Sequence, residues 1–272
     1  MKLKMLLSAA FAAGAIAAAV PASAAPLFPV YTVSPGVLAG TLPTFVANDL
    51  GGQYNEVITF DTSTTFHVSL LFIGGNFSLD DTLGSTTYNS AQSGLGSKYG
   101  LYALFRGAGT YDSVSIPGTT KFLLTPGGLI DLWLDPKNNT TFGNPSPFNG
   151  ANPFVTFNGI GFDDILLGSG NAISGSGNSV CTGGNNCGSF GQTSSFALTA
   201  AGMGFFTSPV PFYSMALTSG QFQGVIPQIG TSILLTGTAN TVFNSVPEPT
   251  ALALVGVALV GLGLSRRLTS KG

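Results

Sequence analysis

Apolar and polar side chains alternate along several short segments of this chain, which is the pattern of β-strands with one buried face. The clearest case places Phe66, Val68, Leu70 and Phe72 on one face of a strand and Thr65, His67 and Ser69 on the other. Further strand-like runs are 54–61, 99–105, 121–125, 129–134, 154–157, 195–199 and 232–238. No internal segment has a sustained helical stripe with caps. The pattern therefore predicts a protein made mainly of short strands.

Turn signals separate the predicted strands at fairly regular intervals. They include Pro117-Gly118, Pro126-Gly127-Gly128 and Asn149-Gly150. Many short strands at such spacing are typical of two packed antiparallel sheets. We therefore expect residues 25–245 to form one all-β domain, an antiparallel β-sandwich of jelly-roll-like type. A solenoid is the weaker alternative because no clean internal repeat occurs.

The composition indicates that this domain buries a full core while carrying few charges. The chain has 21 phenylalanines and 38 glycines, and only 7% of its residues are charged. So many aromatic residues argue against disorder. The domain's basic residues are Lys98, Arg106, Lys121 and Lys137, against all of the chain's 11 acids except Glu248. This mildly acidic balance argues against nucleic acid as a partner.

Residues Gly168 to Gly191 form a low-complexity stretch of Gly, Ser and Asn, which predicts a flexible loop. Cys181 and Cys187, the only cysteines, lie within it. In an oxidising compartment we expect them to form a disulfide, which would hold the loop and contribute roughly 2–3 kcal/mol if unstrained. The alternative is a metal or redox pair. It is weaker because two cysteines supply half of a zinc site and the single histidine is distant in sequence.

A search for catalytic residues finds none, and we expect neither a cofactor nor a metal. His67 is the only histidine and lies on the polar face of its strand, so a partly exposed structural role is expected. No Gly-x-Ser-x-Gly elbow and no glycine-rich nucleotide-binding frame occurs. Calcium stays open as an alternative, because Asp80-Asp81 and Asp163-Asp164 are acidic pairs in turn-like settings. A glycosidase would need two acids facing each other across a cleft.

The segment 129–136 suggests a surface for carbohydrate. As a strand it projects Asp131, Trp133 and Asp135 from one face, and its aliphatic side chains from the other. With the aliphatic face inward, the only tryptophan would lie outside between two carboxylates, where a sugar ring could stack and hydrogen-bond. The alternative is that Trp133 covers part of a second core or a long loop.

The first residues have the three parts of a secretory signal peptide. Lys2 and Lys4 form a charged region, residues 6–20 an apolar region, and Ala22-Ser23-Ala24 a cleavage site with small side chains. We expect signal peptidase to cut after Ala24, leaving residues 1–24 out of the mature chain. A retained N-terminal helix is the weaker alternative because Pro21 ends the apolar run.

About the last 27 residues, from 246 to 272, combine a break, an apolar helix and a basic end. Val246, Pro247, Glu248 and Pro249 form an extended, protease-accessible segment because proline continues neither helix nor sheet. The apolar run 251–264 has about 14 residues, whereas a spanning helix needs roughly 20. Arg266 and Arg267 then hold the end on the cytoplasmic side. The tail predicts transient membrane insertion.

This order of motif, apolar run and basic pair resembles the PEP-CTERM sorting signal of Gram-negative bacteria that make exopolysaccharide. The resemblance implies that a membrane protease of the exosortase type cleaves near Pro247-Glu248-Pro249 and releases the protein to the cell surface or matrix. The alternative is a simple C-terminal membrane helix after a proline-containing linker, which the short, glycine-containing run disfavours.

Four phrases of the body also resemble flocculation-associated PEP-CTERM proteins. They are residues 54–60, 99–105, 186–190 and 195–199. This resemblance implies a structural or adhesive role in floc or biofilm formation, with extracellular polysaccharide as a partner and no catalytic residue. The rival functions are a secreted hydrolase acting on polysaccharide and a calcium-dependent carbohydrate-binding module.

Overall fold

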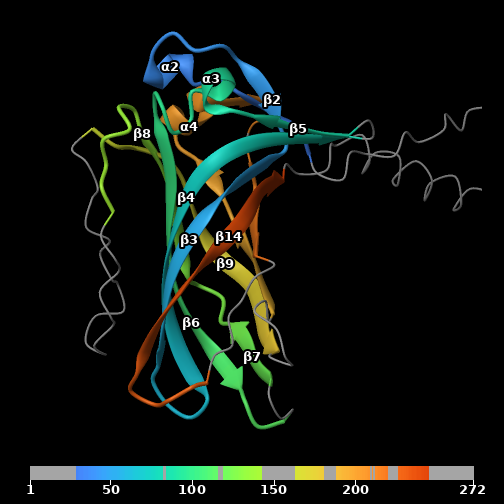
Figure 1. Cartoon of the computed structure of the whole chain (residues 1–272), viewed down its shortest axis with the longest axis vertical. Coiled ribbons are helices and arrows are strands. Elements are labelled where there is room, and N and C mark those ends of the chain that lie inside the picture. The colour runs from blue at the N-terminus through green and yellow to red at the C-terminus, as the bar shows by residue number, and fades with distance from the viewer. Residues whose placement is uncertain are drawn as a thin grey trace, which may run out of the picture.

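Antiparallel strands make up most of the described chain (Figure 1). This computed structural model describes residues 29–81, 84–115, 119–142, 163–180, 188–208, 210, 212–219 and 226–244. The expected strand 154–157, both cysteines and both terminal segments, with their expected helices, lie outside the described residues. Within the described residues, no helix is long and apolar enough to cross a membrane.

One large sheet contains eleven strands. They are β3 (Asp49–Phe60), β4 (Thr65–Asp81), β5 (Gly84–Tyr88), β6 (Gly100–Asp112), β7 (Thr119–Leu124), β8 (Leu129–Asp135), β9 (Ile165–Val180), β10 (Ser189–Ser195), β11 (Ala197–Leu198), β13 (Ser214–Ser219) and β14 (Ser232–Asn244). Their order is β5-β4-β3-β14-β13-β10-β9-β7-β6-β8, with β11 paired to β9. Two additional pairings, β4 with β6 and β9 with β8, make the sheet close on itself. Its inward faces therefore pack against each other as in a sandwich, and the expected all-β antiparallel fold is confirmed.

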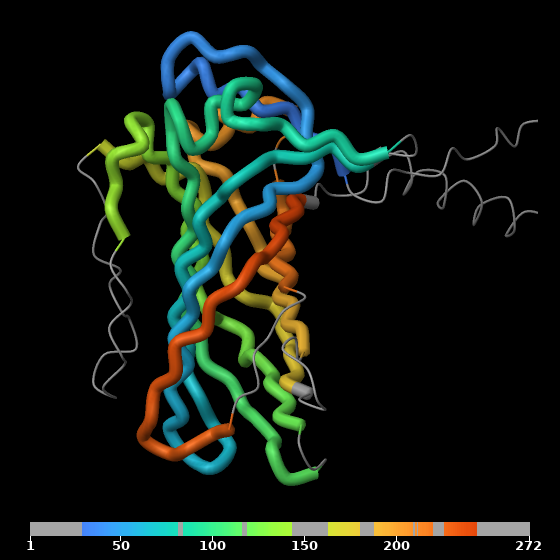
Figure 2. Tube along the Cα trace, viewed as in Figure 1, coloured from blue at the N-terminus to red at the C-terminus, as the bar shows by residue number. Residues whose placement is uncertain are grey.

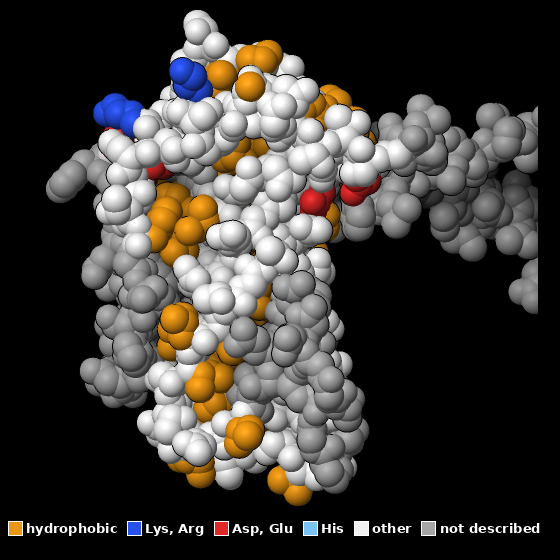
Figure 3. Space-filling model, in the orientation of Figure 1, with side chains coloured by type: hydrophobic (Ala, Val, Ile, Leu, Met, Phe, Trp, Pro, Cys, Tyr) orange, Lys and Arg blue, Asp and Glu red, His pale blue; other side chains and the backbone are white. Residues whose placement is uncertain are grey.

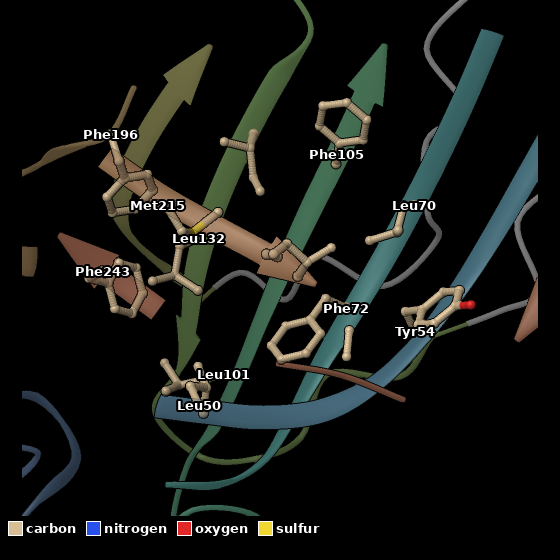
Figure 4. Packing of buried hydrophobic residues seen from close by; sticks show 14 of the residues in the cluster. Leu50, Tyr54, Leu70, Phe72, Leu101, Phe105, Leu132, Phe196, Met215 and Phe243 are labelled. Carbon is tan, nitrogen blue, oxygen red and sulfur yellow. The ribbon is translucent and has the colours of Figure 1, made fainter. Parts of the chain in front are cut away.

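The core lies between these inward faces (Figure 4). The alternation predicted for β4 is confirmed, since Phe66, Val68, Leu70 and Phe72 are all buried in it. Tyr54 and Leu50 approach from β3, and Phe105, Leu132, Met215 and Phe243 from other strands of the sheet. In β4, β6 and β8 a side chain on every second residue contributes to this core, as the period of a strand requires.

A second, smaller sheet lies at one end of the large one, where the blue N-terminal part of the trace runs in Figure 2. It has the order β12-β1-β2 and contains β1 (Tyr31–Val33), β2 (Phe45–Ala47) and β12 (Phe206–Ser208). Three short helices lie at this end in Figure 1: α2 (Gly36–Ala39), α3 (Ser90–Ser93) and α4 (Ala200–Phe205). Tyr31 meets Phe206, Phe212 and Phe243 edge-on, with ring centroids 5.5–5.9 Å apart. Such edge-to-face packing is favourable for aromatic rings.

The glycine-rich stretch differs from the expectation. The structure places residues 165–180 in the long strand β9 and the residues from Ser189 onward in β10, so the predicted loop is wrong for both parts. The reason is close approach: a Cβ atom on Gly170 would lie 1.7 Å from the carbonyl oxygen of Ser195. Glycine here makes room for a neighbouring chain instead of marking a turn.

The predicted strand 195–199 is also shorter than expected. β10 ends at Ser195, and only Ala197 and Leu198 pair with β9. Thr199 then caps α4, its hydroxyl accepting a hydrogen bond from the backbone N–H of Gly202 at 3.1 Å. Threonine favours this position because its side chain satisfies a free N–H at the start of a helix.

We predict that Gly170→Ala destabilises the protein by about 1–3 kcal/mol or more, because the added methyl group overlaps a backbone carbonyl. Gly191→Ala on the adjacent strand is the matched control, since its Cβ would meet its nearest atom at 3.7 Å. Urea denaturation of both variants measures the difference. Equal stability of the two variants would contradict the packing described for β9.

Candidate functional site

The β8 strand has the orientation that the sequence predicts. Ile130, Leu132 and Leu134 are buried in the core, so Asp131, Trp133 and Asp135 project from the outer face. Trp133 is half-buried and lies parallel to Tyr102 of β6, with ring centroids 6.5 Å apart. It belongs to a second apolar cluster on the outer face. Leu71, Ile73, Tyr102, Leu104 and Phe142 are the other members.

Trp133 therefore covers a second apolar cluster, as in the alternative considered for it. Its Nε1 atom is buried and makes no hydrogen bond to any described residue. Asp135 is only 2% exposed. Its carboxylate accepts hydrogen bonds from the backbone N–H groups of Lys137 at 3.1 Å and Thr140 at 2.7 Å, so it stabilises the turn after β8. Asp131 remains half-exposed beside Trp133, and a sugar contact by these residues stays a prediction.

Asp163 and Asp164 are occupied by contacts to the turn after β8 and to β6. The Tyr102 hydroxyl donates to Asp164 at 2.5 Å, and the Thr140 hydroxyl donates to both carboxylate oxygens at 2.9 and 3.0 Å. Burial and the charge of Asp164 raise the pKa of Tyr102 well above its usual value. Lys137 pairs with Asp163 at 3.0 Å. Within the described residues no group of three or more His, Cys, Asp or Glu side chains could hold a metal ion.

His67 is buried, not partly exposed as expected, with 6% of its surface accessible. It pairs with Thr59 of β3 and Ala108 of β6, so both of its neighbouring strands flank it. Its Nδ1 lies 2.8 Å from a carboxylate oxygen of Asp61, the residue that follows β3. Because β4 is paired along both edges, even its polar face is shielded. The contact with Asp61 gives His67 a structural role in the β3–β4 hairpin.

A polar groove that the sequence did not reveal lies on the outer face of β14, β3, β4 and β5. The pairing of residues across neighbouring strands forms this groove. Asp49 pairs with Ser78, Gly51 with Asn76 and Asn240, and Gln53 with Thr238. The five residues from Asp49 to Gln53 cover roughly 13 Å along the strand. Its polar residues are separated by up to 191 positions, from Asp49 to Asn240, so only the folded sheet brings them together.

Asp49 lines one end of this groove and is 6% exposed. The Ser78 hydroxyl donates to it at 3.2 Å. Burial, with a smaller effect from the charge of Asp80, raises the pKa of Asp49 to about 6, although the bond from Ser78 acts in the opposite direction. The neighbouring Asn48 bonds both to the carbonyl and to the N–H of Asp80, at 2.6 and 2.9 Å, and so fixes the groove wall.

Glu56 occupies the opposite face of β3 and points into the core. It lines a small cavity of about 30 Å³, whose other walls are apolar side chains together with Ser176, Gly177 and Gln192. A cavity of this size holds about one water molecule. Glu56 Oε2 has no hydrogen-bond partner among the described residues. Burial raises the pKa of Glu56 to about 8, so the carboxyl group is mainly protonated at neutral pH.

Comparison with known protein families gives a match for the C-terminal segment. Residues 245–267 match the PEP-CTERM protein-sorting motif. The chain carries a PEP-CTERM sorting signal. The match spans the Val246-Pro247-Glu248-Pro249 segment and the pair Arg266 and Arg267, all outside the described residues. Neither the search of curated proteins nor the search of solved structures gives a match.

The PEP-CTERM signal identifies the chain as an exported protein that an exosortase processes. It is anchored transiently by its C-terminal segment. The described β-domain, from residue 29 to residue 244, ends directly before the matched segment.

We predict that the buried Glu56 makes the protein less stable as the pH rises. The folded pKa of about 8 exceeds the ordinary value of 4.5, so the folded state keeps a proton that the unfolded state has lost. The contribution of Glu56 to the free energy of unfolding is largest below pH 4.5. It falls by about 1.4 kcal/mol per pH unit until about pH 8. Glu56→Gln should flatten this slope, as measured by urea denaturation at each pH.

Asp49→Asn is the control for this prediction. The pKa of Asp49 is raised from 3.8 to about 6, so its contribution is lost only between those values. The Asn variant should therefore keep the slope between pH 6 and 8, and the Gln variant should lose it. An unchanged slope in Glu56→Gln would show that Glu56 is ionised in the folded protein.

Proposed function

We propose that this protein acts at the cell surface or in the extracellular matrix, where it binds exopolysaccharide and has a structural or adhesive role in floc or biofilm formation. The match of residues 245–267 to the PEP-CTERM sorting motif carries the proposal, because it makes the chain an exported exosortase substrate. The resemblance of the body to flocculation-associated proteins of this sorting class supports the adhesive part.

The surface of the β-domain supports contacts with polysaccharide that are individually weak. Figure 3 shows one face of the molecule, on which uncharged atoms predominate and charged side chains are few. Hydroxyl and amide groups can exchange hydrogen bonds with sugar hydroxyl groups. Low charge limits repulsion between neighbouring copies and from an anionic matrix. Many copies binding one long polymer would convert weak contacts into firm attachment.

The proposal includes no catalytic step. His67 is paired with Asp61, and Asp135 holds two backbone N–H groups, so both have structural roles. Processing requires two partners, signal peptidase at the N-terminal segment and an exosortase at the Pro247-Glu248-Pro249 motif. Both act before the protein reaches the matrix.

Deletion of the gene tests the adhesive role when aggregation and polysaccharide output are scored separately. We expect cell clumping to fall while the amount and chain length of the polysaccharide stay normal. The reason is that the protein only links polysaccharide chains, which are made by separate enzymes. Complementation with the intact gene serves as the control. A changed polymer length in the deletion strain would indicate a hydrolase and contradict the proposal.

Replacement of Glu248 by Ala, with Pro247 and Pro249 also replaced by Ala, tests processing. We expect the variant to remain in the membrane fraction and to keep the tail, since the protease loses its recognition segment. The intact mass of the membrane-bound and released protein measures this. A Thr250→Ala variant, directly after the Pro247-Glu248-Pro249 segment, is the matched control and should be released normally. Release of the triple variant at normal yield would contradict exosortase cleavage at this motif.

A further inference from the structure

The polar groove on β14, β3 and β4 has a floor without side chains. Gly51 lies at its centre, and the register of the strands shifts between Gly51 and Gly52. On β4 the facing residues Gly74 and Gly75 also line it. Gly51 and Gly74 are buried and Gly75 is exposed, so the groove is shallowest in side-chain atoms along these adjoining strands.

Two asparagine side chains flank this floor from opposite sides. Asn76 comes from β4 and Asn240 from β14, and both pair with Gly51. A Cβ atom on Gly51 would lie 3.2 Å from Oδ1 of Asn76 and 3.3 Å from Oδ1 of Asn240. The two amide groups thus converge on one point above the glycine. Because each amide has both a donor and an acceptor, the pair can bind a group that donates and accepts at once.

The pairs of facing residues on either side of Gly51 also carry hydrogen-bonding groups. Gln53 and Thr238 face each other in one row and are both exposed. Asp49 and Ser78 form the other row and add a carboxylate acceptor. Among the described residues, no Lys, Arg or His and no aromatic side chain lines the groove. An anionic ligand would therefore meet carboxylates without a compensating positive charge, which disfavours it.

We propose that the groove over Gly51 binds a segment of uncharged polysaccharide, with Asn76 and Asn240 as the central contacts. Sugar hydroxyl groups both donate and accept hydrogen bonds, as the converging amides require. The length of the groove suits an oligosaccharide segment better than a single sugar. This inference rests on the proposed function and adds the ligand class and the site, which is distinct from the Trp133 face.

Binding of neutral oligosaccharides tests the inference. These probes are released by partial hydrolysis of the producing cells' exopolysaccharide and separated from the acidic fragments. We expect the exported protein to bind the neutral fraction and Asn76→Ala with Asn240→Ala to weaken binding about tenfold or more, because two hydrogen-bonding amides are lost. Calorimetry gives the affinities. In spectra of ¹⁵N-labelled protein, the side-chain amide signals of Asn76 and Asn240 should shift on binding.

Asn55→Ala with Thr236→Ala is the matched control. These residues pair with each other on β3 and β14 and do not line the groove, so this variant should bind normally. Gly51→Val is a second, independent variant that fills the floor and should abolish binding. Its backbone does not have a positive φ, and the added side chain must displace only the amide groups of Asn76 and Asn240, which a Cβ atom would meet at 3.2 and 3.3 Å. Thermal unfolding of each variant confirms that it is folded.

Several results would overturn the inference. They are normal binding by the Asn76→Ala, Asn240→Ala variant or the Gly51→Val variant, preference for the acidic fragments, and loss of binding in a calcium chelator. The groove inference and the adhesive role fail separately. If the groove variants keep normal affinity while gene deletion still reduces clumping, the site is wrong and the function stands. If deletion leaves clumping unchanged, the function is wrong whatever the groove binds.

Discussion

The pairing of β4 along both of its edges is the constraint on which the rest of the structure depends. β4 has 17 residues, with β3 on one edge and both β5 and β6 on the other. Because β6 leads through β7 and β8 to β9, this double pairing closes the large sheet. A closed sheet has an inside that must be filled and an outside whose residues meet solvent or a partner. Whether a site is part of the core or of the outer surface depends on the side of the sheet on which it lies.

The inside is filled by aromatic rings that lie against glycines. A Cβ atom added to the glycine would come within 2.6–2.8 Å of the nearest ring atom in each case. The pairs are Gly52 with Phe72, Gly109 with Phe66, Gly168 with Phe196, and Gly237 with Tyr54. The ring supplies the apolar surface that glycine lacks, and glycine supplies the space that the ring needs. This explains why a chain with 21 phenylalanines also has 38 glycines without being disordered.

The sequence predicts those features that depend on neighbours in the chain. The period of two along 66–72 and 129–134 correctly identified the buried faces of β4 and β8, because alternation depends only on strand geometry. Glycine occurs both in turns and where two strands approach each other closely. The local pattern did not distinguish a turn from the close strand approach that forms β9. His67 was expected at the surface because its own strand looks amphipathic. Only the position of β6 beside β4 shows that it is buried.

The groove could not be predicted because its residues come from distant parts of the chain. Gly51, Asn76 and Asn240 look like unrelated strand residues, and their convergence depends on the register of two separate strand pairs. The tail is the opposite case, since its motif, apolar run and basic pair are contiguous and could be recognised directly.

These two kinds of information bear on different steps of the protein's function. The PEP-CTERM signal directs the sorting of the chain through a short C-terminal segment that follows the described β-domain. What the protein does after delivery must then reside in the domain itself, where few charges are available for strong ionic contacts. A site built from amides and hydroxyl groups is weak as a single unit, because each hydrogen bond to a ligand replaces one to water. It is effective on a polymer that offers the same hydroxyl pattern many times, provided that many copies of the protein share that polymer. Few charges and a surface of hydroxyl and amide groups are therefore physically compatible with the adhesive role that we propose.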